Sequence, residues 1–248
     1  MVVAYTATYA AVEVVGGTSP QVGLWLQALL VLVATNHYAL APSQGGAFLP
    51  ALIVASTYRI IAISLPVTSE ALVLRLTATG ASTLLSALLA RRMVPDIRPP
   101  VRAPSRLRQQ AAVGATGVPI AFGTWLATTT RVGHAASLTV TPHGVAPTLF
   151  LLAALALGAF VEEVVFRGLI QSGARDVSAR LAVPVSTVMF AASYAGARPV
   201  MYVVVVAMAG FLFSVVRERT GSILGTWTAH TIVNISVISL FPMFTVRH

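Results

Sequence analysis

Long apolar runs, each close to the length of a membrane-spanning helix, alternate with short polar or proline-containing stretches along most of the chain. About 20 consecutive apolar residues are enough to cross a bilayer as a helix. The pattern therefore predicts an all-α polytopic membrane protein with about eight transmembrane helices. These predicted helices cover residues 22–40, 47–65, 71–89, 111–129, 147–172, 182–194, 199–216 and 223–244.

Two segments fall outside these runs. Residues 1–20 are only weakly apolar, carry Glu13 and end in Gly-Gly-Thr-Ser-Pro, so they are predicted to form a tail or an interfacial helix, with a further membrane helix left open.

Residues 91–110 contain six arginines and four prolines, which disfavours a regular helix. By the positive-inside rule this stretch is predicted to be the main cytoplasmic loop. Docking of a partner or an anionic lipid is its alternative use.

The sides of the membrane follow from that loop by alternation. Residues 175–180 and 217–219 are also basic and fall on the same, inner side, whereas the N-terminus falls outside. No internal repeat is evident, so residues 1–248 are predicted to form a single transmembrane domain.

Composition supports membrane insertion and excludes several other classes. The chain is 56% hydrophobic and 9% charged, with a mean hydropathy of +0.84, whereas a soluble domain has about 25% charged residues. Its net charge is +9. We attribute this charge to membrane topology and to contact with anionic headgroups rather than to nucleic-acid binding, because no aromatic residues interleave with the basic ones as a nucleic-acid surface requires. Without cysteine there is no disulfide, thiolate metal site or cysteine nucleophile. The expected partner is the lipid bilayer, with no nucleic acid.

The candidate chemistry begins with two adjacent carboxylates, Glu162 and Glu163, near the end of the apolar run that starts at Pro147. Only seven acidic residues occur in the chain, and an ionisable group at bilayer depth costs a few kcal/mol, so it is rarely there without a role. Glu163 and Arg167 are four apart and can pair along one helix face, while Glu162 points about 100° away towards other helices. A purely structural ion-pair network is the alternative reading of all three residues.

A second polar pair, His230 and Asn234, lies in the last predicted helix and shares one face. Alone, such a pair more often makes hydrogen bonds between helices than takes part in chemistry. Glu162 and His230, however, both lie roughly 12–15 Å from the predicted inner ends of their helices, at about 1.5 Å per residue. Polar groups at one depth on two helices predict a common cavity.

Taken in order, these motifs resemble the signature of the CAAX-processing and bacteriocin-processing (CPBP, or abortive-infection) family of intramembrane glutamate proteases, whose best-known branch is the type II CAAX prenyl protease. The family pattern is Glu-Glu-x-x-x-Arg, then Phe-x-x-x-His, then His-x-x-x-Asn or His-x-x-x-Asp. This chain supplies the first and third motifs, and the resemblance extends over residues 147–241. The resemblance implies that Glu162 and the middle-motif histidine activate a water molecule, and that His230 and Asn234 stabilise the oxyanion.

The middle motif departs from the family pattern. Phe190 is in place, but Tyr194 stands where the family has histidine. A phenol with a pKa near 10 is a poor proton relay at neutral pH and a poorer metal ligand than imidazole. A metal is therefore possible but not favoured, and no cofactor is expected.

Two functions follow from the resemblance and this departure. The first is an intramembrane endopeptidase that hydrolyses a peptide bond of a membrane-associated peptide or protein near the cytoplasmic face, with water activated by Glu162. Slow hydrolysis is then expected, because of Tyr194. The second is a catalytically silent relative that binds a membrane protein, a lipid or a lipidated peptide in the same cavity. For both functions the protein is expected to lie in a membrane, specifically a prokaryotic plasma membrane.

Overall fold

The computed structural model describes residues 1–65, 72–93, 107–129, 145–196 and 200–240, and within them every regular element is helical. The predicted all-α class is confirmed. Most of the predicted basic loop, 91–110, lies outside the described residues, as does the end of the last predicted helix.

The first half of the chain contains seven helices within the described residues. Their bounds are α1 Val2–Thr18, α2 Pro20–Leu40, α3 Pro42–Gly45, α4 Phe48–Ser64, α5 Leu72–Met93, α6 Leu107–Ala115 and α7 Gly117–Thr129.

The second half carries the candidate site, and two of its helices continue into wider π-helical turns. The bounds are α8 Val145–Glu163, η1 Val164–Ile170 (π), α9 Gln171–Val177, η2 Ala179–Leu181 (3₁₀), α10 Ala182–Ala195, α11 Val200–Thr220, α12 Leu224–Ile235 and η3 Ser236–Leu240 (π).

Within the described residues, three helical stretches are long and apolar enough to cross a membrane: Pro20–Leu40, Pro147–Val177 and Val200–Thr220. Phe48–Ser64 and Ala179–Ala195 are shorter apolar helices. The number of crossings stays a prediction.

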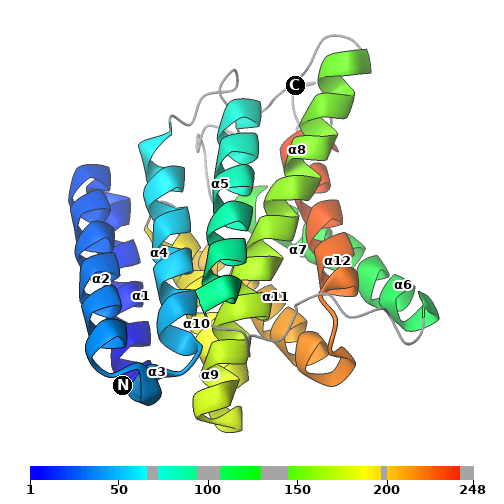
Figure 1. Cartoon of the computed structure of the whole chain (residues 1–248). Coiled ribbons are helices and arrows are strands. Elements are labelled where there is room, and N and C mark those ends of the chain that lie inside the picture. The colour runs from blue at the N-terminus through cyan, green and yellow to red at the C-terminus, as the bar shows by residue number, and fades with distance from the viewer. Residues whose placement is uncertain (66–71, 94–106, 130–144, 197–199, 241–248) are drawn as a thin grey trace.

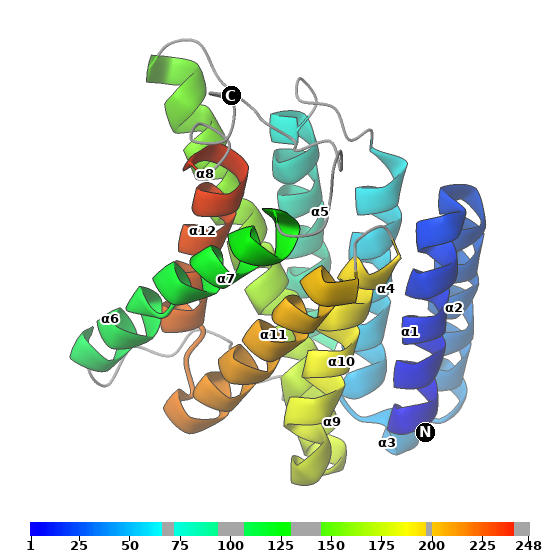
Figure 2. The same ribbon diagram turned by 180° about the vertical axis from the view of Figure 1, so that it is seen from behind.

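The helices form two layers that meet around η1. One layer runs α2, α4, α5, α8 and α12, each packed on the next (Figure 1). Behind it lie α1, α10, α11 and α7, of which α1 packs on α10 and α7 on both α11 and α12 (Figure 2). Because η1 contacts α4, α8, α10 and α11, the residues that follow the paired glutamates lie at the centre of the bundle.

The N-terminal segment is a full member of this bundle, so the prediction of a tail is wrong. Helix α1 packs on α2 and α10, with Tyr9 completely buried. Inside the bundle, Glu13 receives two hydrogen bonds of 2.7 Å from Arg59 and one of 2.8 Å from Gln27. This cluster satisfies a buried charge in an otherwise apolar segment, which explains why residues 1–20 appear too polar for a packed helix.

The extra helix also changes where the chain begins. Since α1 and α2 run in opposite directions, Met1 lies beside α3, at the end of the bundle where α9 ends (Figures 1 and 2). The expectation that the N-terminus lies at the end opposite residues 175–180 is therefore wrong. The sequence pattern did not predict α1 as a helix of the bundle, because its hydrophobicity is weak.

Two further boundaries differ from the sequence pattern. The predicted helix 111–129 begins earlier and is divided at Thr116 into α6 and α7. On either side of the division, Gly114 and Gly117 lie against α12. Arg175 and Asp176 lie beyond residue 172, the predicted end of the helix that carries the glutamates, but they are still part of α9, which ends only at Val177. A salt bridge of 3.1 Å from Arg175 to Glu218 of α11 holds this last turn.

Candidate active site

The carboxylate of Glu162 lies at the meeting point of three helices. It is at the end of α8, and each of its oxygens accepts a hydrogen bond from a tyrosine. Tyr58 of α4 donates to Oε1 at 2.9 Å, and Tyr194 of α10 donates to Oε2 at 2.8 Å. With 16% of its side chain exposed, Glu162 is the more accessible of the two glutamates. A carboxylate has about four lone-pair positions, so the two phenols leave acceptor capacity for a water molecule.

Glu163 points in a different direction and is completely buried. Its Oε1 is 3.2 Å from a terminal nitrogen of Arg167, which confirms the ion pair predicted from the four-residue spacing. The same oxygen is 3.0 Å from Nδ1 of His230 on α12. This second contact was not predicted, and it makes Glu163 a bridge between the arginine and the imidazole.

Arg167 is enclosed as tightly as its partner. The guanidinium carbon lies 4.0 Å from the ring centre of Phe190 and 5.6 Å from that of Phe213, and a terminal nitrogen donates to the Gly210 carbonyl at 3.3 Å. Such cation–π contacts stabilise a desolvated cation. Phe190, the middle-motif residue that agrees with the family pattern, therefore contacts the charged centre directly.

The π-helical geometry of η1 accompanies this arrangement. Phe166 O accepts the backbone N–H of Gln171, five residues on, and also the hydroxyl of Ser186 at 2.9 Å. A π-turn adds a residue to the helical turn and occurs frequently at functional sites. Here it follows directly after Glu163 and contains Arg167.

His230 faces both glutamates. While Nδ1 contacts Glu163, Nε2 lies 3.7 Å from Glu162 Oε2, the oxygen that also accepts the Tyr194 hydroxyl. The rings of Phe190 and Phe213 lie 5.8 and 6.2 Å from the imidazole and enclose it. The proximity of Glu162 and His230 expected from their common depth is therefore confirmed.

Asn234 lies one helical turn beyond His230 and is partly buried. Within the described residues no hydrogen bond joins its side chain to Glu162, Tyr194 or His230. The structure therefore brings together three of the four predicted catalytic residues, and leaves Asn234 one helical turn further along α12 without a hydrogen bond to them.

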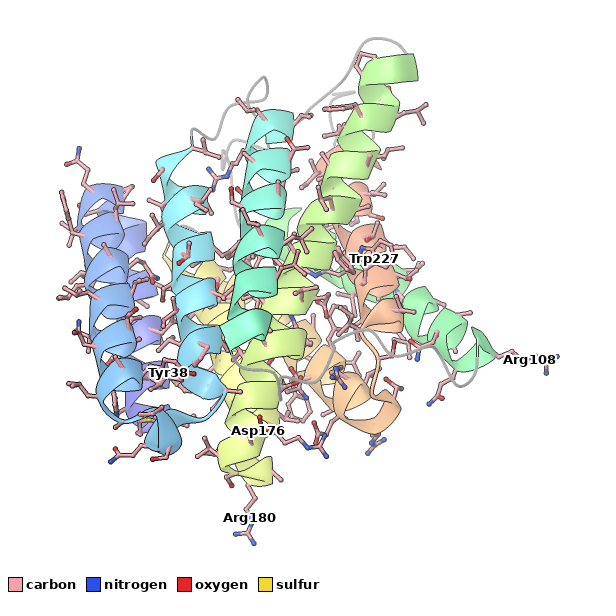
Figure 3. All side chains as sticks on the ribbon, in the orientation of Figure 1. Tyr38, Arg108, Asp176, Arg180 and Trp227 are labelled. Atoms are coloured by element: carbon pink, nitrogen blue, oxygen red, sulfur yellow. The ribbon has the colours of Figure 1, made fainter. Side chains whose placement is uncertain are left out.

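Helix α12, which carries His230, is fixed at its beginning by two distant residues. The Gly225 amide donates to the Gln110 side chain at 2.7 Å, and the Trp227 indole donates to the Ala156 carbonyl of α8 at 2.9 Å. Figure 3 shows Trp227 on α12 beside α8. In addition, a Cβ on Gly117 would come within 2.5 Å of the Ala229 carbonyl, so α7 packs very closely on α12.

Sequence reasoning missed Tyr58. It comes from α4, far outside the stretch that carries the motifs, and a tyrosine in an apolar helix is usually a packing residue with a hydroxyl partner. The only available signal was its neighbour Arg59, a charged residue in the same apolar run. Nothing in the spacing of either residue connects it to Glu162.

A metal centre would need several histidine or acidic side chains arranged around one point. The part of the chain that the structure describes contains no group of three or more histidine, aspartate and glutamate side chains arranged to hold a metal ion. The expectation of a site without a metal or another cofactor stays a prediction.

Taken together, the apolar helices and their buried centre of two carboxylates, one imidazole and one arginine define an integral membrane protein of the all-α class with a polar site inside the bundle. A comparison with family models makes this more specific. Residues 144–236 match the family described as Type II CAAX prenyl endopeptidase Rce1-like. This match covers a little over a third of the chain, and it supports the resemblance to the CAAX-protease family seen in the motifs. No curated protein and no solved structure gives a significant match.

Proposed function

We propose that this protein is an intramembrane endopeptidase in which Glu162 activates the hydrolytic water. The observation that carries the proposal is the position of Glu162, whose carboxylate is partly exposed and lies 3.7 Å from the His230 imidazole. A membrane-associated peptide or protein is the proposed substrate, in keeping with the matched family. The whole chain would act as one transmembrane domain, with residues 147–241 as its catalytic core.

The chemistry follows from the geometry of the two side chains. A water molecule about 2.8 Å from both Glu162 Oε2 and His230 Nε2 fits the 3.7 Å gap between them. Held in this way, its oxygen is directed at a substrate carbonyl. Transfer of its proton to a positioned base lowers the barrier by a factor on the order of 10²–10⁴. Asn234, one turn further along α12, is the proposed amide donor to the oxyanion that forms.

The phenols of Tyr58 and Tyr194 have a defined part in this mechanism. Both donate to Glu162, and a hydrogen bond to an ionised group contributes about 1.5–3 kcal/mol. They would hold the carboxylate in one orientation. Neither hydroxyl proton is free for donation to the substrate while these bonds are made.

A specific observation also favours the silent alternative. Tyr194 occupies the position of the family histidine, and its hydroxyl, with that of Tyr58, uses one acceptor position on each oxygen of Glu162. If substrate does not displace these bonds, fewer acceptor positions of Glu162 remain for the hydrolytic water, and the cavity binds a membrane ligand without hydrolysing it.

Cleavage by purified protein separates these two functions. The wild type and Glu162→Gln, reconstituted in liposomes, would be incubated with a panel of membrane-anchored peptides, and products identified by mass spectrometry. We expect cleavage by the wild type and none by Glu162→Gln, whose similar shape preserves the fold. Equal product from both proteins would refute Glu162 as the activating group. Retention of intact peptides by both would favour the binding function.

A further inference from the structure

Tyr194 replaces the family histidine, so α10 supplies no imidazole to the proposed reaction. The imidazole of His230, however, lies beside the carboxylate of Glu162. We propose that His230 accepts the proton of the water molecule that Glu162 holds and activates, and that Glu163 is the positioning residue that makes this possible. The inference rests on the proposed function and assigns a different role to His230 than oxyanion stabilisation.

The hydrogen-bond partner of His230 Nδ1 determines which ring nitrogen carries the proton. It lies 3.0 Å from Oε1 of Glu163, a completely buried carboxylate that is ion-paired with Arg167. An ionised carboxylate can only accept, so the proton of this bond must be on Nδ1. In a neutral imidazole the other nitrogen, Nε2, then carries the lone pair and is itself an acceptor.

On the other side of the ring, His230 Nε2 faces Glu162 without a direct hydrogen bond. Nε2 is 3.7 Å from Glu162 Oε2, which is too long for a direct N–H···O bond. Tyr194 already donates to that oxygen at 2.8 Å. Two acceptors that face each other across 3.7 Å are the partners that the two hydrogens of one water molecule require.

The imidazole ring of His230 has a fixed orientation. Phe190 stands perpendicular to the imidazole at 5.8 Å and Phe213 lies 6.2 Å away. These rings restrict rotation of the imidazole, so the bond to Glu163 determines which nitrogen faces Glu162. Tyr194 cannot perform the same task, because a phenol that donates to Glu162 offers no basic nitrogen to the water.

In the proposed step His230 takes one proton from the water molecule and later gives it to the leaving amine. The water donates one hydrogen to His230 Nε2 and the other to Glu162 Oε2, and its oxygen forms a bond to the carbonyl carbon. One proton passes to Nε2, giving an imidazolium that the Glu163 carboxylate stabilises. As the carbon–nitrogen bond breaks, Nε2–H returns this proton to the leaving amine. The products are a carboxylic acid and an amine, with the imidazole neutral again.

The test is the protonation pattern of His230 itself, which does not depend on finding a substrate. Protein labelled with ¹⁵N-histidine, in detergent micelles at neutral pH, would be studied by NMR, and the His230 signals assigned by their loss in His230→Gln. We expect a proton on Nδ1 and the high-frequency signal of an unprotonated Nε2. A proton on Nε2, alone or together with one on Nδ1, would overturn the assignment of His230 as acceptor.

The role of Glu163 is tested by a matched pair of variants. Glu163→Leu removes the acceptor for Nδ1–H and should move the proton to Nε2, the other tautomer. Glu13→Gln weakens a comparable buried ion pair, with Arg59, away from the site, and should leave the His230 signals unchanged. If Glu163→Leu keeps the wild-type tautomer, Glu163 is not the positioning residue. If Glu163→Leu does not fold, the wild-type spectrum still decides the tautomer.

These readouts separate this inference from the proposed function. Cleavage of the peptide panel together with a proton on Nε2 would retain the protease and reject the role of His230. The expected tautomer together with no cleavage of any peptide would reject the protease, and show that Glu163 orients the imidazole of a binding site.

Discussion

The Tyr58 hydroxyl donates a 2.9 Å hydrogen bond to Oε1 of Glu162, although the two residues are 104 positions apart in the sequence. Tyr58 belongs to α4, outside the region that matches the family model, whereas Glu162 lies inside it. The bond therefore makes the N-terminal helices part of the candidate active site as well as part of its membrane scaffold.

We expect Tyr58→Phe to lower the hydrolysis rate by about 10- to 100-fold, the equivalent of one hydrogen bond to a charged group. The ring is retained, so packing should be preserved, and the loss should appear mainly in kcat. Tyr5→Phe is the matched control, since it removes a phenol bonded to His37 at 3.0 Å, away from the site. A Tyr58→Phe enzyme with wild-type kcat would show that Glu162 does not depend on this bond.

Much of the fold and part of the site could be predicted because they depend on local pattern. Apolar runs give the helices, and the four-residue spacing gives the ion pair of Glu163 with Arg167. Common depth is sufficient to bring Glu162 near His230. Contacts that depend on which distant helices pack together could not be predicted, and the bond from Tyr58 is of this kind.

The N-terminal helix shows a second limit of sequence patterns. Its buried Glu13 lowers the hydrophobicity of residues 1–20, and only the packed structure supplies the partner, Arg59, that makes this burial possible. The bridge from Glu163 to His230 was missed for a related reason. The carboxylate had a sufficient partner in Arg167 along its own helix, and nothing in the sequence indicated a second one.

Arg167→Ala should destabilise the protein by about 3–5 kcal/mol, because it leaves a buried carboxylate without its charge partner. Arg175→Ala is the control: its salt bridge to Glu218 is exposed, with 43% of the arginine side chain accessible, so a loss of only about 0–1 kcal/mol is expected. Unfolding of both variants in mixed detergent micelles measures the difference. Equal stability of the two would argue against a structural role for the Glu163–Arg167 pair.

Gly17→Ala should disturb the packing of α1 on α10, because a Cβ at this position would overlap the backbone of Gly196. We expect a loss of about 1–3 kcal/mol, as for other overpacked positions. Gly123→Ala is a suitable control, since nothing lies within 4 Å of its added Cβ. It should be neutral or gain up to about 1 kcal/mol through helix propensity. A harmless Gly17→Ala would mean that α1 and α10 do not pack this closely.

The last prediction concerns Tyr194, which reaches the same oxygen of Glu162 that faces His230 Nε2. If the reaction lacked an imidazole, Tyr194→His would supply one and raise the rate by a factor on the order of 10² or more. If His230 already accepts the proton, the variant adds little, and we expect less than about a tenfold change in a rate that still depends on Glu162.

The smaller ring of Tyr194→His should cost about 1–3 kcal/mol of stability through lost volume, so its folding is to be measured together with its rate. Tyr194→Phe provides the comparison, because it keeps the ring and removes only the hydroxyl that donates to Glu162. A folded Tyr194→His variant that cleaves peptides a hundredfold faster than the wild type would contradict the role assigned to His230. Such a result would identify the tyrosine as the reason for slow hydrolysis.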